Sequence, residues 1–139
     1  MNYRPYEHGD WQLVVNALIK LEQYAKKYEW AIEVDFLVAV GQIYDALKLG
    51  QGYFVDGYLV MTDETVPWYS TKPVLMEWLV LKLAPGGSVD SIPDALVEIA
   101  KARGIGLVMT ADSSPVNIVA GAYNRAGFKQ LTSSFFKVV

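Results

Sequence analysis

Glu77 is the only acidic residue in the most apolar stretch of the chain, VLMEWLVLKL, which runs from Val74 to Leu83. Apolar surroundings remove water from a carboxylate, and this raises its pKa toward the range that suits a general base. Glu77 is therefore a candidate for removing a proton from a substrate. The structural alternative is that Glu77 points to an exposed edge or pairs with Lys72 or Lys82.

Tyr123 lies four residues before Gly127-Phe128, in a segment with a helical pattern. With an ordinary pKa of about 10, its phenol is protonated at neutral pH and can donate a proton to a leaving group such as a thiolate. The gap between two neighbouring strands is the place where it would act. The alternative is a core aromatic side chain whose hydroxyl is hydrogen-bonded at the edge of the core.

A glycine turn, Pro85-Gly86-Gly87-Ser88, follows the apolar stretch. Where a strand runs through small residues into a helix, the first N–H groups of the helix are unpaired and attract an anion. The turn is therefore a candidate phosphate-binding loop, although glycines also suit a tight connection that binds nothing. His8 stands alone in a polar segment and receives no role.

The first half of the chain predicts a short strand at Tyr3–Tyr6 and two helices. Asp10 is placed to cap a helix that begins at Trp11. A second helical pattern runs from Asp35 to about Leu49. The aromatic pair Trp68 and Tyr69 forms either a pocket wall or a plug in the core.

The second half predicts a sheet with an α/β crossover. Asp56-Gly57 marks a hairpin between strands at 53–55 and 58–61, and residues 62–73 form a loop. A strand at 74–83, a helix at about 92–103 with a Ser91/Asp94 capping box, and a strand at 107–111 make a βαβ unit. A helix starting at Ser113 or Ser114, with Val116, Val119, Ala120 and Tyr123 on one side, and one or two strands within 128–139 complete the chain.

Length, charge and composition limit the function classes. The 139 residues suit one domain over 1–139. A net charge of -3 without a basic block argues against nucleic acid and membrane partners. The absence of cysteine excludes thiolate metal sites, and no metal is expected. Neither a secretion signal nor a membrane span is visible, so a cytoplasmic location is expected.

Three segments together resemble the GNAT-type N-acetyltransferases, and in particular small members encoded by tailed bacteriophages. They are NYRPYEHGDW at the start, PWYSTKPVLMEWLVLKLAPGGS in the middle, and AYNRAGF at residues 122–128. The resemblance covers nearly the whole chain. It implies a mixed, mostly antiparallel α/β sheet with a central βαβ unit and flanking helices.

The resemblance also implies a mechanism. A base deprotonates the amine of a small molecule or protein, the amine attacks acetyl-CoA, and a tyrosine protonates the CoA thiolate. Tyr123 matches the tyrosine and Glu77 matches a glutamate base of some members. The positions that would hold the cosubstrate are strand backbone at Leu81 and Leu83 and the pyrophosphate loop at Gly86, Gly87, Ser88, Val89 and Ser91.

The loop departs from the family's Q/R-x-x-G-x-G/A pattern, which aligns with Ser88 to Pro93. The basic or amide residue is missing, Asp90 adds a negative charge, and Pro93 removes an N–H donor. Two hypotheses therefore stand. One is an acetyl-CoA-dependent acyltransferase, and the other is a protein of the same fold with a structural or binding role and no catalysis.

Overall fold

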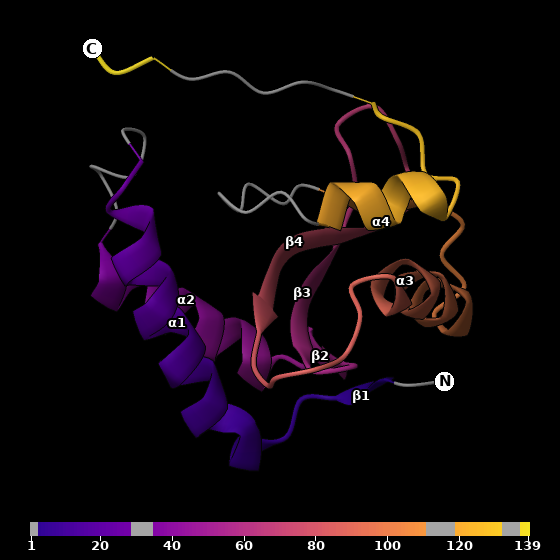
Figure 1. Ribbon diagram of the computed structural model, residues 1–139. Coiled ribbons are helices and arrows are strands. Elements are labelled where there is room, and N and C mark those ends of the chain that lie inside the picture. The colour runs from indigo at the N-terminus through magenta and orange to yellow at the C-terminus, as the bar shows by residue number, and fades with distance from the viewer. Residues whose placement is uncertain (1–2, 29–34, 111–118, 132–136) are drawn as a thin grey trace.

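The computed structural model describes residues 3–28, 35–110, 119–131 and 137–139, and it shows one sheet with helices on both faces (Figure 1). The five strands follow the order β1-β2-β3-β4-β5. Neighbouring strands are antiparallel except β4 and β5, which are parallel. The expected mixed, mostly antiparallel sheet with a strand–helix–strand unit is confirmed.

The strands are β1 (Tyr3–Pro5), β2 (Gly52–Val55), β3 (Tyr58–Thr65), β4 (Val74–Lys82) and β5 (Val108–Thr110). The helices are the short 3-10 helix η1 (His8–Asp10), α1 (Trp11–Ala25), α2 (Phe36–Lys48), α3 (Ser91–Ala102) and α4 (Val119–Arg125).

Two chain segments differ from the prediction. Residues 62–65 belong to β3 rather than to a loop, because they pair with residues 74–77 of β4. The described part of the C-terminal segment, 128–131 and 137–139, forms no strand, and residues 132–136 lie outside the described residues. The predicted start of the last helix, at Ser113 or Ser114, also lies outside them.

The turn between β2 and β3 has the predicted type. Val55 pairs with Tyr58, so Asp56 and Gly57 form a two-residue hairpin loop. Their φ angles are 46° and 86°, the positive values of a type I′ turn. This backbone matches the twist of the flanking strands and fixes the direction in which Asp56 leaves the sheet.

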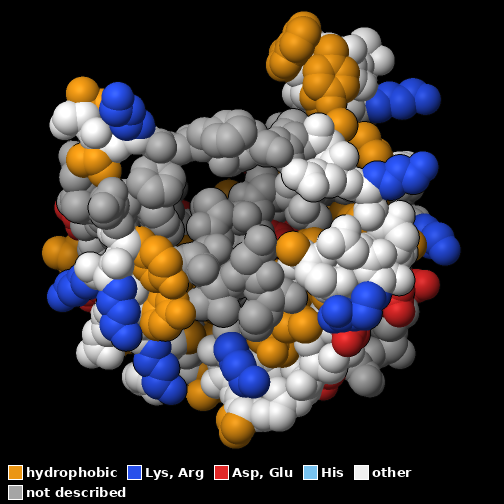
Figure 2. Space-filling model, turned by 45° about the horizontal axis from the view of Figure 1, so that its top comes forward, with side chains coloured by type: hydrophobic (Ala, Val, Ile, Leu, Met, Phe, Trp, Pro, Cys, Tyr) orange, Lys and Arg blue, Asp and Glu red, His pale blue; other side chains and the backbone are white. Residues whose placement is uncertain are grey.

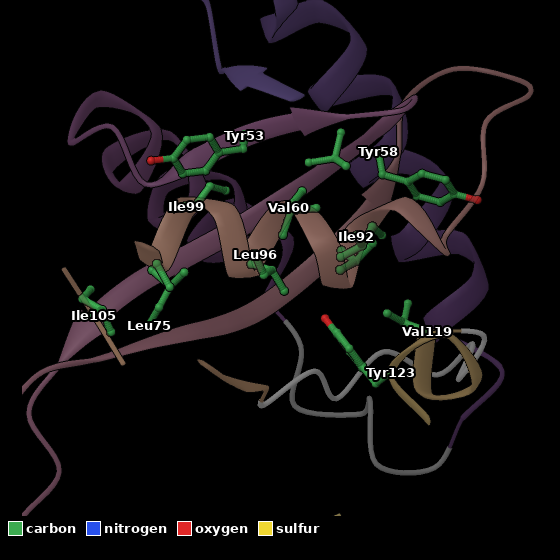
Figure 3. Close-up of a cluster of buried hydrophobic side chains, with 14 residues drawn as sticks. Tyr53, Tyr58, Val60, Leu75, Ile92, Leu96, Ile99, Ile105, Val119 and Tyr123 are labelled. Carbon is green, nitrogen blue, oxygen red and sulfur yellow. The ribbon is translucent and has the colours of Figure 1, made fainter. Parts of the chain in front are cut away.

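Alternating side chains give the sheet two separate cores. One face packs against α3 and α4, with Leu75 and Val60 from the sheet and Leu96 from α3 (Figure 3). The other face packs against α1 and α2, with Leu59 and Met61 from β3. Because successive residues of a strand point to opposite faces, β4 is covered on both sides, as its apolar sequence predicts.

The predicted caps of two helices are wrong, and in both cases a partner outside the helix binds the side chain. Asp10 does occupy the position before α1, but its carboxylate accepts hydrogen bonds from the Arg4 guanidinium, both at 2.8 Å, instead of capping the helix. Ser91 is the first residue of α3 rather than its cap, and its hydroxyl donates to Asp56 at 3.1 Å. The Ser91/Asp94 capping box is therefore not formed.

Candidate active site

The parallel strands β4 and β5 pair over only three residues. The last pair is Glu77 with Thr110, after which β4 continues for five more residues to Lys82. Along that part of β4, no strand of the described residues pairs on the β5 side. An unpaired strand edge exposes backbone N–H and C=O groups that bind an extended ligand.

Glu77 and Tyr123 are hydrogen-bonded at the point where the two strands part. The Tyr123 hydroxyl donates to Glu77 Oε1 at 2.5 Å. Glu77 is completely buried, and Tyr123 is 7% exposed. Figure 3 shows the tyrosine ring reaching from α4 toward the core with its hydroxyl leading. The structure thus joins the two predicted catalytic residues, and the structural alternative for Glu77, an exposed edge or a lysine partner, is wrong.

The AYNRAGF segment explains how Tyr123 is held. After α4 ends, the backbone N–H of Phe128 donates to the carbonyl oxygen of Tyr123 at 2.9 Å. The chain therefore folds back, and the Phe128 ring packs against the Tyr123 ring with centroids 5.1 Å apart. Such a hydrophobic contact across a helix C-terminus fixes the direction of the last turn. It holds the phenol over β4.

A β-bulge sets the orientation of the strand beyond Glu77. Glu77 pairs with Thr62 and Leu79 pairs with Met61, so Trp78 has no counterpart on β3. Trp78 and Leu79 consequently both pack on the α1/α2 side, although they are consecutive. A bulge of this kind bends a strand and redirects its side chains.

The predicted backbone contacts at Leu81 and Leu83 need correction. The Leu83 N–H donates to the Gly57 carbonyl at 2.9 Å, and Leu81 pairs with Leu59. Backbone groups alternate between the two edges of a strand, so Leu81 and Leu83 both face β3. The residues that face the open edge are Val80 and Lys82.

The glycine turn before α3 already holds an anion from its own chain. The Ser88 N–H donates to Asp56 Oδ2 at 2.8 Å, and the Ser91 hydroxyl donates to the same oxygen at 3.1 Å. Asp56 comes from the β2–β3 turn, 32 residues away from Ser88. In the sequence, Asp56 is recognisable only as a turn residue, and its contact with the glycine turn is not predicted.

Other N–H groups of the same turn also have acceptors within the chain. The N–H of Asp90 donates to Ser88 Oγ, that of Ser91 to the Ser88 carbonyl, and that of Ile92 to the Val89 carbonyl. Gly86 and Gly87 have positive φ angles, as a tight turn requires. The turn has the shape of an anion site, but these four N–H groups, from Ser88, Asp90, Ser91 and Ile92, already have acceptors within the chain.

Arg125 connects the turn to the tyrosine helix. Its Nε and Nη2 atoms donate to Asp90 Oδ1 at 2.8 and 2.5 Å. Arg125 lies two residues after Tyr123, so this ion pair ties the end of α4 to the start of α3. In the sequence, Asp90 is recognisable only as a charge that repels phosphate, and its partner Arg125 is not predicted.

Known structures show which fold this is. No family model matches the chain, and no curated protein matches its sequence. A Clostridium acetobutylicum protein, described as a predicted acetyltransferase with acetyl-CoA, matches with a TM-score of 0.64 and 18% identity, over 99% of this chain and 95% of its own. The fold is that of the GNAT-type acetyltransferases.

Two further structures share this acetyltransferase fold. The aminoglycoside antibiotic 6'-N-acetyltransferase of Acinetobacter haemolyticus has a TM-score of 0.63 at 13% identity, over 100% of this chain and 98% of its own. An acetyltransferase of Trypanosoma brucei has a TM-score of 0.55 at 19% identity, over 99% and 98%. The matches extend over the full described architecture.

The surface adds two observations. On the face in Figure 2, lysine and arginine side chains lie on both sides and across the lower part of the molecule. Among the described residues, no helix is long and apolar enough to span a membrane, and no group of three or more histidine or acidic residues is arranged to hold a metal ion.

Proposed function

We propose that this protein is an acyltransferase that moves an acyl group, acetyl in the expected case, from a thioester such as acetyl-CoA to an amine of a small molecule or protein. The observation that carries the proposal is the Tyr123–Glu77 hydrogen bond at the point where β4 and β5 part. The acetyltransferase fold supports it.

Tyr123 is the proposed proton donor. In the transfer, the amine nitrogen forms a bond to the thioester carbon, the carbon–sulfur bond breaks, and the electron pair leaves with sulfur. The Tyr123 hydroxyl protonates that sulfur. The proton released by the amine nitrogen returns to the tyrosine, so the reaction moves one proton from nitrogen to sulfur and leaves the Tyr123–Glu77 pair unchanged.

Glu77 acts through Tyr123 in this proposal. Its carboxylate is completely buried and contacts the phenol, so it orients the hydroxyl and accepts a proton within the pair. It is therefore a positioning residue rather than a base that touches the amine. Backbone groups of Val80 and Lys82, at the open edge of β4, are placed to hold the arm of the thioester.

The test is release of free thiol from an acyl thioester in the presence of a panel of amines. Tyr123→Phe should lower turnover by about 10²-fold, the usual contribution of a positioned proton donor. Tyr58→Phe is the matched control, because Tyr58 lies in the same core cluster and loses only a hydroxyl (Figure 3). It should keep full activity. Equal losses in both variants would remove Tyr123 from the chemistry.

A role in binding without catalysis is the second candidate, and the Asp56 carboxylate at the glycine turn favours it. A folded protein that releases no thiol from any thioester with any amine would reject the acyltransferase and leave this candidate. Conversely, amine-dependent turnover above the uncatalysed rate would reject the role in binding without catalysis.

A further inference from the structure

At the α3 N-terminus a glycine turn, a helix start and two acidic side chains meet. The acidic side chains are Asp56, from the β2–β3 turn, and Asp90, which precedes the helix. A helix N-terminus favours a negative charge because its first N–H groups point outward. Here one of the chain's own carboxylates, that of Asp56, accepts from the Ser88 N–H just before the helix and from the Ser91 hydroxyl at its first residue.

We infer that Asp56 is the anion that this turn is built to hold, and that the acyl donor is therefore recognised through its acyl and pantetheine portion, without a diphosphate at the α3 N-terminus. The second half of the inference rests on the proposed acyltransfer. The first half concerns the turn alone and is tested separately.

The β2–β3 turn and the glycine turn are in close backbone contact. The backbone of Asp56 lies directly against Gly87, where a Cβ would come within 1.9 Å of the Asp56 carbonyl oxygen. On the other side, a Cβ at Gly57 would come within 3.3 Å of the Ala84 carbonyl. This backbone packing keeps the Asp56 side chain beside the Ser88 N–H.

Charge opposes an external diphosphate at the same place. It would meet the carboxylates of Asp56 and Asp90, and like charges a few ångströms apart repel each other strongly. Arg125 is the described cation at this turn, and its Nε and Nη2 are both directed at Asp90 Oδ1. No lysine or arginine occurs between Pro85 and Glu98 to offset the charge.

The first half of the inference, which concerns the turn, is tested by NMR titration of the protein with 3'-phosphoadenosine 5'-diphosphate, the nucleotide end of CoA. The amide signals of Ser88 to Ile92 should not move up to about 5 mM, a concentration at which even weak binding is visible. Saturable shifts of these amides would overturn the inference, whether or not the protein is an enzyme.

A variant removes the internal anion while keeping the turn. Asp56→Gly retains a residue that tolerates the positive φ, so the hairpin should fold normally. The Ser88 amide should exchange with solvent at least about tenfold faster, and the nucleotide should now shift the turn amides. Asp45→Asn, an equal change of charge on exposed α2, should do neither. An Asp56→Gly protein with unchanged Ser88 exchange or no gain of nucleotide binding would overturn the inference.

The second half of the inference, which concerns recognition of the acyl donor, is tested by comparing acetyl-CoA with S-acetylpantetheine as substrates of the wild-type protein. Their kcat/KM values should agree within about threefold, because the nucleotide adds no binding energy. A preference for acetyl-CoA of more than about thirtyfold would overturn this half. Absence of turnover with both donors would reject the proposed function, while the nucleotide titration would still decide the role of Asp56.

Discussion

Gly87 touches the backbone of Asp56, and a Cβ there would lie 1.9 Å from the Asp56 carbonyl oxygen and 2.9 Å from the carbonyl carbon. Gly86, its neighbour, has a similar positive φ of 79° but open space where a Cβ would be. Substitutions at Gly86 and Gly87 therefore separate two destabilising effects of replacing a glycine, namely an unfavourable backbone angle and a steric clash.

Gly86→Ala should lower the free energy of unfolding by about 1 kcal/mol, the cost of a left-handed backbone for alanine. Gly87→Ala should cost at least about 2 kcal/mol more, because the clash is with backbone and the two turns must separate. Urea unfolding of both variants gives the comparison. Equal effects would show that the two turns do not contact each other as described.

Tyr123→Phe should also change stability. The substitution removes a hydrogen bond to a completely buried carboxylate, so the free energy of unfolding should fall by about 1 to 3 kcal/mol. Tyr58→Phe should change it by less than about 0.5 kcal/mol. A double-mutant cycle with Glu77→Gln should give a coupling energy of at least about 1 kcal/mol. Additive effects would argue against a direct bond between Tyr123 and Glu77.

The Arg4–Asp10 pair predicts a dependence of stability on pH. The hydrogen bonds from Arg4 lower the pKa of Asp10 below its ordinary value of 3.8. The contribution of this carboxylate to the free energy of unfolding is therefore fully present above pH 3.8. It is lost as the pH falls through the lower pKa that Asp10 has in the folded protein.

Asp10→Asn should therefore be less stable than wild type at neutral pH, by about 1 kcal/mol because Arg4 is partly exposed. The difference should shrink as the pH is lowered below about 4. Denaturant unfolding from neutral to acidic pH measures it, with Asp45→Asn as a control. A difference that stays constant down to about pH 2 would contradict the pair's role.

Asp35 caps α2 with its side chain, so removing its carboxylate should lower the stability of the protein. Its carboxylate accepts a hydrogen bond from the Val38 N–H at 3.2 Å, at the start of α2. Asp35→Ala should lower the free energy of unfolding by about 1 kcal/mol. Asp45→Ala, within the same helix, should have little effect because Asp45 is exposed. Thermal or urea unfolding of both variants tests this, and equal losses would exclude capping.

The local features of the fold could be predicted from the sequence. The Asp56-Gly57 turn follows from two adjacent residues. The β4 strand follows from a ten-residue stretch in which only Glu77 and Lys82 are not apolar. The caps of α1 and α3 were wrong because Asp10 and Ser91 each have a stronger partner elsewhere, Arg4 and Asp56. Capping rules consider only the neighbouring backbone, so they do not include such competition.

The candidate site could be predicted only as separate residues. The sequence points to Tyr123 and Glu77, but they are 46 residues apart, and their bond depends on how α4 packs on the sheet. The same limit applies to Asp56 and Ser88. A glycine turn indicates that an anion belongs there, and only the folded chain shows that the anion comes from another turn of the same protein.

The bulge at Trp78 affects how this chain must be compared with others. Residues before and after Trp78 are out of phase by one position, so Glu77 and Val80 face the same core although they are three residues apart. A relative without the extra residue would keep both faces intact with a strand one residue shorter. An alignment that crosses β4 without a gap would then place a residue of the α3/α4 side opposite one of the α1/α2 side, and the equivalent of Glu77 would be sought on the wrong face of the sheet.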